Sequence, residues 1–262
     1  MLGTWNGGEK MNVLIACEES QTVCRAFREV GHNAFSCDIQ ECSGGHPEWH
    51  ISGDVMRYLN PTKCENRIVF FTMDGEQHLV KKWDLIIAHP PCIFLSNVAT
   101  RHHSLNTSTL ERINDRTFKR IEAMRFFMNI ANADCDRIAI ENPVGVMNTA
   151  YRKPDQIIEP YFFAENEADT ENYVTKRTCL WLKGLPILEH KAIVNNICDT
   201  PPLFADFTES IKKPDNGELF GKYESGQNRC WEEVTHGSKR RSKTFDGVAK
   251  AMAEQWGKLE RK

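Results

Sequence analysis

The chain has 262 residues and a formal net charge of −3 at pH 7, which fits one large domain or one domain with a small appended segment. Hydrophobic residues make up 40% and charged residues 26%, a composition typical of a soluble globular protein. No apolar run approaches the roughly 20 residues of a membrane-spanning helix, and the polar, Gly-rich residues 1–10 show no secretory signal, so we expect a cytoplasmic protein with a disordered N-terminus.

The first elements along the chain predict the start of an α/β sheet. Residues Asn12–Ala16 form a short apolar run that is typical of a buried strand. Apolar residues then recur with helical spacing over residues 23–30, and Gly31 stands where a C-terminal cap belongs. Residues 33–37 predict a second strand, which ends at Asp38.

The rest of the chain continues this alternation. A hairpin is predicted over residues 67–80, with Asp74-Gly75 as its turn. Further apolar runs predict buried strands at residues 83–88, 137–140 and 176–183. Helices are predicted at residues 110–133, 155–163 and 244–256. Strands that alternate with helices indicate a doubly wound, Rossmann-like α/β fold.

Residues 185–241 interrupt this pattern with prolines and glycines and with little periodicity. We interpret them as a small irregular insertion into one domain, which spans residues 11–184 and 242–258. The insertion holds the densest basic stretch of the chain, with Lys239, Arg240 and Arg241. Because the net charge is negative, a nucleic-acid binder must gather positive charge on one face, and this stretch is the candidate. A solvated loop is the alternative interpretation.

The ten cysteines predict free thiols, because nothing indicates secretion and a chain of this size needs no disulfides. The sequence contains no Cys-x-x-Cys pair, so we expect no structural zinc site.

Polar side chains follow four of the predicted strands where each strand ends. They are Glu18 with Glu19, Asp38, Cys92 and Glu141. Since ligands of open α/β sheets bind beyond the carboxyl ends of the strands, we expect these side chains to line one site.

Asp38 and Asp54 are the candidates for binding a nucleoside-type cofactor. Asp38 lies about twenty residues beyond the first strand, where an acid can accept hydrogen bonds from both ribose hydroxyls. Asp54, in Gly53-Asp54, could place a second carboxylate against an adenine amino group. A strand-terminating or capping role is the alternative for Asp38, and a simple turn is the alternative for Gly53-Asp54.

Cys92 stands in the sequence His89-Pro90-Pro91-Cys92, directly after a predicted buried strand. Two prolines restrict the backbone, so the loop is stiff and holds the thiol in one place. A nucleophile needs this stiffness if it must meet a ring carbon within about 3–3.5 Å. A buried structural cysteine is the alternative.

Glu141 is the natural partner of such a thiol if the substrate is cytosine. Attack at carbon 6 of cytosine becomes easier when ring nitrogen 3 accepts a proton, and a carboxylic acid can deliver it. We expect burial to raise the pKa of Glu141 for this purpose. Positive charge from Lys176 or Arg177 would lower the pKa of the Cys92 thiol. A simple turn at the end of the strand is the alternative interpretation of Glu141-Asn142-Pro143.

In this order, the motifs resemble those of the DNA cytosine-5 methyltransferases, most closely the short phage and prophage members of that family. The resemblance covers residues 11–256. Pro90-Pro91-Cys92 matches the catalytic loop of the family, and Glu141-Asn142, about fifty residues later, matches its Glu-Asn pair. The other matching segments, in chain order, are Val13–Ser20, Asp38, Gly53-Asp54-Val55, Thr175-Lys176-Arg177 and the closing helix from Thr244.

The resemblance implies a class I S-adenosylmethionine-dependent fold and methyl transfer to carbon 5 of cytosine. Cys92 would add to carbon 6 of a flipped-out base while Glu141 protonates nitrogen 3, with Arg177 as a third catalytic residue and with no metal. The implied cofactor-binding residues are Cys17, Glu18, Glu19, Asp38, Ile39, Asp54, Val55, Pro90 and Thr244.

The implied partner is DNA, and we expect it to be double-stranded. Lys176 and the basic stretch of Lys239, Arg240 and Arg241 are the expected DNA-binding residues, and residues 185–241 would form a small target-recognition segment. The setting would be a bacterial or phage-infected cell, with a role in restriction-modification or phage DNA methylation.

The sequence departs from the family pattern at three places. Residues 16–20 (Ala-Cys-Glu-Glu-Ser) replace the Gly-rich cofactor loop, so we expect Glu18 or Glu19 to contact the methionine ammonium group. His89 stands where the family has glycine, and Cys179 replaces the second arginine of its Gln-x-Arg-x-Arg pattern. These changes leave open a modified donor such as a carboxylated S-adenosylmethionine.

Three other functions stay open. An amino-methyltransferase has Asp or Asn before Pro-Pro and an aromatic residue after it, whereas His89 and Cys92 fit carbon methylation. A free pyrimidine-nucleotide enzyme, such as a hydroxymethylase, would use the same thiol addition. A catalytically inactive DNA-binding protein would not need both Cys92 and Glu141.

Overall fold

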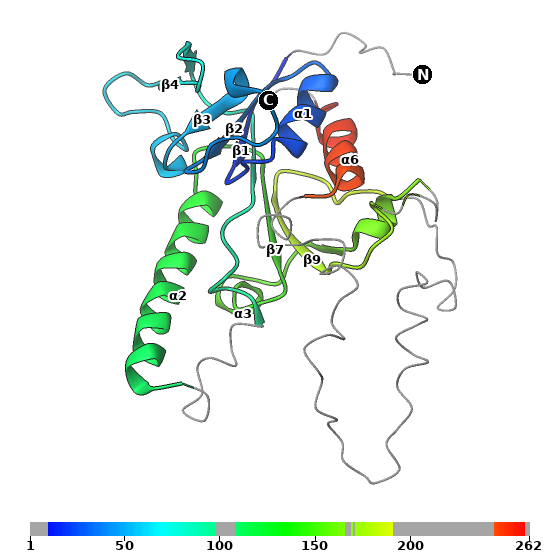
Figure 1. Cartoon of the computed structure of the whole chain (residues 1–262). Helices are drawn as coiled ribbons and strands as arrows, with labels where there is room; N and C mark the ends of the chain where they lie inside the picture. The colour runs from blue at the N-terminus through cyan, green and yellow to red at the C-terminus, as the bar shows by residue number, and fades with distance from the viewer. Residues whose placement is uncertain (1–9, 98–107, 166–168, 170, 191–243, 260–262) are drawn as a thin grey trace.

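A seven-stranded, mostly parallel sheet forms the centre of the computed structural model, with the strand order β3-β2-β1-β6-β7-β9-β8 (Figure 1). The structure describes residues 10–97, 108–165, 169, 171–190 and 244–259. The strands of the sheet are β1 (Asn12–Ala16), β2 (Asn33–Asp38), β3 (His50–Ser52), β6 (Leu85–Ala88), β7 (Ile138–Pro143), β8 (Gln156–Ile158) and β9 (Thr178–Lys183). The chain is thus an α/β protein as predicted, and the sheet is consistent with a Rossmann-like fold.

Helices cover both faces of this sheet. Figure 1 shows α1 (Thr22–Glu29) and α6 (Asp246–Trp256) side by side on one face and the long α2 (Leu110–Ala131) on the other. Val13 and Ile15 of β1 pack with α1 and α6, whereas Leu14 and Ala16 pack in the core that α2 covers. Because both faces of β1 are buried, the strand is a continuous apolar run in the sequence.

The order of the strands reverses at β1. The chain adds β2 and β3 on one side of β1, and β6 and β7 on its other side. β1 pairs in parallel with both β2 and β6. The carboxyl ends of β1 and β6 are therefore the switch point, the place where open α/β sheets bind their ligands.

Two predicted turns are confirmed by their backbone geometry. Gly31 follows α1 with φ 95°, the left-handed conformation of a C-terminal cap. The predicted hairpin is formed by β4 (Ile68–Phe71) and β5 (Gln77–Val80), which pair antiparallel. Gly75 in its turn has φ 90°, a conformation that glycine adopts without steric cost.

The short helix predicted around Pro160, at residues 155–163, is confirmed only in part. The second half of this segment is a short 3-10 helix, η4 (Pro160–Phe163), whereas the first half forms β8. Antiparallel pairing with β9 decides the conformation of β8, since Ile157 pairs with Cys179 and Ile158 with Thr178. A partner strand some twenty residues away overrides a weak helical pattern.

Among the strands, β7 is longer than predicted and β3 was not predicted at all. β7 does not end before Glu141 but continues to Pro143, because Glu141 pairs with Leu180 of β9 and Asn142 with Cys179. β3, a strand of three residues, was not predicted, and it pairs in parallel with the end of β2. Glu141 and Asn142 are therefore fixed by the sheet rather than carried on a free loop.

Residues 185–190, at the start of the predicted insertion, pack on the main domain. Trp256 Nε1 donates to the carbonyl of Pro186 at 3.0 Å, and the amide of Leu188 donates to Gln156 Oε1 at 2.8 Å. Residues 191–243, with the predicted DNA-binding residues Lys239, Arg240 and Arg241, lie outside the described residues, as do residues 1–9.

The described part of the chain shows eight cysteines, and all eight are free. Within this part, no group of His, Cys, Asp and Glu side chains could hold a metal ion. No helix of these residues is both long and apolar enough to cross a membrane.

Candidate functional site

Three loops meet at the switch point, after β1, after β6 and at the end of β7. The amide of His89 donates to the carbonyl of Ala16 at 2.9 Å, which joins the loop after β6 to the end of β1. Asn142 Nδ2 donates to the carbonyl of Pro90 at 2.7 Å. The Glu-Asn pair of β7 therefore holds the Pro-Pro-Cys loop in place through Asn142.

The loop that carries Cys92 is also held on its far side. The amides of Leu95 and Ser96 both donate to the carbonyl of Cys92 at 2.9 Å, and the amide of Val146 donates to the carbonyl of Leu95 at 2.8 Å. A Cβ added at Gly145 would overlap the carbonyl oxygen of Leu95, so only glycine allows this close approach. Cys92 is an exposed residue whose thiol is partly desolvated.

Glu141 lies beneath this loop in a small polar cluster. Its Oε2 lies 3.1 Å from His89 Nδ1, and the two side chains are only 11% and 9% exposed. The Thr244 hydroxyl donates to the same oxygen at 3.3 Å and lies 3.4 Å from His89 Nδ1. Thr244, which the resemblance assigns to the cofactor site, thus lies against the carboxyl of Glu141.

The expected raised pKa of Glu141 is wrong for this arrangement. Burial alone raises the pKa of this carboxyl, but the hydrogen bond and charge of His89, with help from Lys176 and Thr244, outweigh burial and lower the pKa to about 2. For His89, burial lowers the pKa, and the carboxylates of Glu141 and Glu18 more than compensate, so that its pKa is raised. The two side chains thus form a buried ion pair.

The positive charge that faces the thiol comes from Lys176. Burial raises the pKa of Cys92, Lys176 opposes this shift, and the charge of Glu141 adds to it. Arg177, the predicted catalytic arginine, is 70% exposed and its Nε lies 3.5 Å from Glu159 Oε1. The structure therefore brings Lys176, predicted to bind DNA, to Cys92 and Glu141, and directs Arg177 to another partner.

The loop after β1 turns without glycine. Cys17 and Gln21 have φ 61° and φ 59°, left-handed conformations that are uncommon for such residues and that cluster at functional sites. Glu18 is 4% exposed, and its carboxylate accepts from the amides of Val23 and Cys24 at 2.6 and 3.1 Å. Glu18 thus caps the N-terminus of α1.

Three polar atoms of these loops are buried without a hydrogen-bond partner: Glu19 Oε2, His89 Nε2 and Asn142 Oδ1. Buried polar atoms are nearly always paired, so each unpaired one needs an explanation. The three belong to the ends of β1, β6 and β7, which meet at the switch point. A polar ligand bound at this switch point would satisfy them.

Asp38 and Asp54, the two predicted cofactor-binding carboxylates, lie near the end of β2. Asp38 Oδ1 accepts a hydrogen bond from the amide of Gln40, and Asp54 Oδ1 accepts one from the amide of Met56. Burial, and then the negative charge of these two carboxylates, raises the pKa of the Cys17 thiol. The side chain of Ile39 is 79% exposed beside Asp38. Val55, by contrast, is buried in the core, so its side chain contributes packing.

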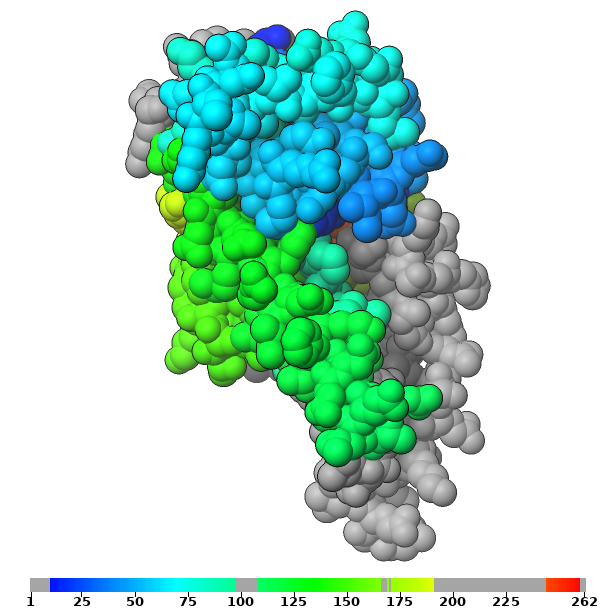
Figure 2. All heavy atoms as spheres, turned by 90° about the vertical axis from the view of Figure 1, so that its left-hand side faces the viewer, coloured from blue at the N-terminus to red at the C-terminus, as the bar shows by residue number. Residues whose placement is uncertain are grey.

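Two arginines that the sequence did not single out lie on α2 beside the Cys92 loop. Arg120 Nε donates to the carbonyl of Phe94 at 3.0 Å, and the Arg116 guanidinium lies 5.3 Å from the centre of the Phe94 ring. Arg116 Nε and Arg120 Nη2 are buried without a hydrogen-bond partner. Burial and then the charge of Arg116 lower the pKa of Arg120. Figure 2 shows α2, in green, open along this face of the molecule.

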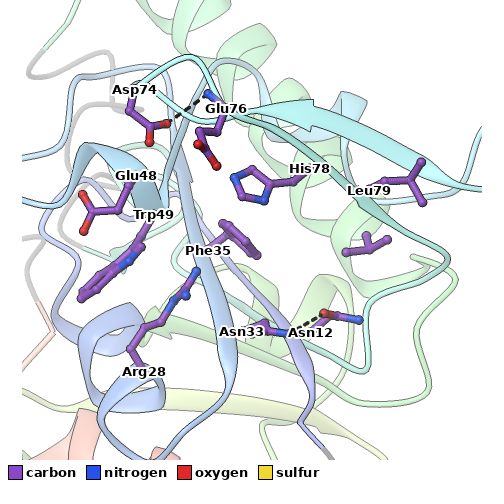
Figure 3. A pocket seen from close by; sticks show the side chains of 11 residues that line it. Asn12, Arg28, Asn33, Phe35, Glu48, Trp49, Asp74, Glu76, His78 and Leu79 are labelled. Carbon is purple, nitrogen blue, oxygen red and sulfur yellow. Dashed lines mark hydrogen bonds between the residues drawn. The ribbon is translucent and has the colours of Figure 1, made fainter.

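A cavity of about 380 Å³ lies elsewhere, between β2, the hairpin and the 3-10 helix η1 (Pro47–Trp49). Figure 3 shows Arg28, Phe35 and Trp49 below the acidic side chains of its rim. Asn12 and Asn33, the first residues of β1 and β2, also line it. The cavity therefore lies at the amino ends of these strands, opposite the cluster around Cys92.

The ion pair predicts how stability depends on pH. The pKa of Glu141 falls on folding from 4.5 to about 2, so its contribution is present above pH 4.5 and is lost as the pH falls toward 2. The pKa of His89 rises above 6.5 on folding, so its contribution is complete below pH 6.5 and is lost as the pH rises through the folded value. Together they should stabilise the protein most between these limits, and the shift of Glu141 alone corresponds to a contribution on the order of 3 kcal/mol.

Urea unfolding of the wild type and of the double variant His89→Gln/Glu141→Gln measures this contribution. The difference in unfolding free energy should be largest near pH 5.5 and smaller at pH 3 and pH 9. An equal difference at all three pH values would contradict the ion pair.

Comparisons with known proteins leave this site to be interpreted from its own geometry. No protein-family model matches the chain, and no curated protein matches it.

Proposed function

We propose that the protein is an S-adenosylmethionine-dependent methyltransferase that modifies carbon 5 of cytosine in DNA through a covalent bond from Cys92. The observation that carries this proposal is the coupling of an exposed cysteine to a buried carboxyl. Asn142 binds the Cys92 loop through Pro90, and its neighbour Glu141 lies in the buried cluster with His89. Attack on a cytosine ring needs these two groups in fixed relation.

The sheet also supports a methyltransferase. β9 runs antiparallel to both β7 and β8 and lies between them at one end of an otherwise parallel sheet. This arrangement resembles that of the class I S-adenosylmethionine-dependent methyltransferases. The side chains proposed to react lie at the carboxyl edge of the same sheet, where such a fold binds its ligands.

In the proposed reaction, the Cys92 thiolate adds to carbon 6 of a cytosine that has been flipped out of the duplex. Lys176 favours the thiolate, because its charge opposes the rise that burial causes in the pKa of Cys92. The carboxyl of Glu141 delivers a proton to ring nitrogen 3, which neutralises the charge that builds up after the attack. Thr244 and His89 fix the orientation of this carboxyl through Oε2.

The cofactor would lie on the β1 and β2 side of the switch point, and the residues there fit it. The unpaired Glu19 Oε2 suits the methionine ammonium group, Asp38 suits the ribose hydroxyls, and exposed Ile39 suits a face of the adenine ring. S-adenosylmethionine, when bound, supplies the methyl group that carbon 5 accepts. Glu18 is left as a helix cap, so Glu19 is the better candidate for the ammonium group.

Arg116 and Arg120 favour DNA over a free nucleotide. They lie one helical turn apart on α2 against Phe94, and the positive charge of the two guanidinium groups suits the phosphates of a strand that passes the Cys92 loop. Replacing both by alanine should weaken binding to a cytosine-containing duplex and reduce the salt slope of log K by about 2. Fluorescence anisotropy over a range of salt concentrations measures both quantities.

The matched control is a pair of surface cations on the same helix, Arg112 and Arg125. Their replacement should change the salt slope by less than the Arg116/Arg120 pair does. An unchanged slope for the Arg116/Arg120 variant would remove α2 from the DNA interface.

The proposed function is tested by incubating the protein with duplex DNA and methyl-labelled S-adenosylmethionine. Label should appear in the DNA and not in free deoxycytidine monophosphate offered in its place. Label in the free nucleotide and not in DNA would favour the nucleotide-modifying alternative. Label in neither substrate would count against a methyltransferase.

A further inference from the structure

We propose that His89 stores the proton that the Glu141 carboxyl delivers to ring nitrogen 3 of the base. The inference rests on the proposed function and adds a residue to it. His89 acts through Glu141 and does not contact the base, so it is a positioning residue that supplies a proton to Glu141. The contacts that support this proposal lie within the polar cluster beneath Cys92.

The imidazole is held on one side and unpaired on the other. Its Nδ1 faces Glu141 Oε2 at 3.1 Å and the Thr244 hydroxyl at 3.4 Å. Its Nε2 is buried without a hydrogen-bond partner. The backbone of His89 is fixed by the bond from its amide to the carbonyl of Ala16. The ring therefore has one partner that can exchange a proton, and this partner is the carboxyl next to the reacting thiol.

The charges around the ring favour its protonated form. The negative charges of Glu141, at the end of β7, and of Glu18, in the loop after β1, raise the pKa of His89. Each of these effects is larger than that of Lys176, which precedes β9 and lowers the pKa of His89. Burial opposes the charge, but the net effect raises the pKa of His89. In the same cluster the pKa of Glu141 is lowered to about 2. Between the lowered pKa of Glu141 and the raised pKa of His89, the exchangeable proton of this pair thus resides on His89.

The proton balance of the proposed step is simple. The bond from Nδ1 of His89 to its proton breaks, and a bond from the same proton to the Glu141 carboxyl forms. The carboxyl then loses this proton to ring nitrogen 3 as the Cys92 sulfur bonds to carbon 6. The imidazolium becomes a neutral imidazole, Glu141 is again a carboxylate, and the base carries the proton.

This scheme sets the pH profile of covalent attack. The rate depends on the product of the thiolate fraction of Cys92 and the protonated fraction of the donor. It therefore rises with pH up to the pKa of the donor and is flat from there to the pKa of Cys92. If His89 is the donor, the rise ends above pH 6.5, because the pKa of His89 is raised from that value.

The experiment measures single-turnover adduct formation from pH 5 to pH 9 with S-adenosylmethionine and duplex DNA that contains 5-fluorocytosine, because methyl transfer to carbon 5 makes the thiol addition irreversible. In the wild type the rate should level off above pH 6.5. In His89→Gln the amide still donates to Glu141, but the rise should end at lower pH and the plateau should be about 10²-fold lower. Thr244→Val removes the other hydrogen bond to Oε2 without removing a titrating group, so it should lower the plateau and leave the levelling point unchanged. A His89→Gln variant with the wild-type profile and plateau would overturn the proposal.

A second measurement does not depend on the activity of the variant. In protein labelled with 15N-histidine, NMR should show that His89 keeps its charge above pH 6.5 and that Glu141→Gln lowers its pKa. An unchanged titration in Glu141→Gln would also overturn the proposal. If the wild type forms no adduct at any pH, the proposed function fails, whereas an adduct with a profile insensitive to His89 removes only the proton store.

Discussion

Cys92→Ala should abolish the covalent adduct with DNA that contains 5-fluorocytosine and should lower methyl transfer by about 10⁴-fold or more. The reason is that cytosine carbon 5 becomes nucleophilic only after a thiolate has added at carbon 6. Cys92 is exposed on a loop that Asn142 and Gly145 hold in place, so loss of its thiol removes the nucleophile and leaves the loop contacts intact. Denaturing gel electrophoresis of the protein–DNA mixture measures the adduct.

Cys64→Ala is the matched control, because Cys64 is also an exposed free thiol and follows the 3-10 helix η2 (Val55–Arg57), away from the cluster. This variant should form the adduct at the wild-type rate. An adduct that persists in Cys92→Ala and disappears in Cys64→Ala would show that Cys64 is the nucleophile, and it would contradict the role proposed for Cys92.

Glu141→Gln should lower the rate of adduct formation by about 10²–10⁴-fold, because glutamine keeps the shape of the side chain and cannot deliver the proton. The binding of DNA should change little, since the Glu141 side chain is buried and is not among those proposed to contact the phosphates. Single-turnover kinetics and anisotropy on one DNA separate the two effects.

Glu48→Gln serves as the control for this change, because Glu48 pairs with His46 at the amino-end side of the sheet. It should leave the rate of adduct formation unchanged. A Glu141→Gln variant that reacts within about threefold of the wild type would mean that ring nitrogen 3 takes its proton from another source.

The parallel part of the sheet was predictable, because strands buried on both faces are continuous apolar runs in the sequence. β1, β2 and β6 follow such runs closely, and the topology then places Cys92 and Glu141 at the same edge of the sheet, as expected. β8 was not predictable in this way. It is three residues long and owes its conformation to β9, so its own sequence carries little of the information.

The charges of the site were less predictable than its position. Burial alone suggested a raised pKa for Glu141, whereas a histidine 52 positions earlier lowers it, and no local pattern links the two residues. Lys176 and Arg177 precede β9 in a segment without regular secondary structure, so no periodicity indicates which of the two side chains faces Cys92. Sequence alone did not decide which one would.

Arg116 and Arg120 were missed for a similar reason. They stand on a helix with charges of both signs, where a solvated surface is the ordinary interpretation. Their contacts with Phe94, beside Cys92, distinguish them from the other cations of α2. A basic residue placed next to a catalytic loop is a signal that only the fold provides.

Mass spectrometry of the nucleosides from duplex DNA treated with the protein and S-adenosylmethionine tests the central claim most directly, because it identifies both the modified base and the transferred group. We expect 5-methylcytosine, formed by the wild type and absent from DNA treated with Cys92→Ala. N4-methylcytosine or N6-methyladenine would contradict attack by Cys92 on the cytosine ring, and unmodified DNA would contradict the proposed function as a whole.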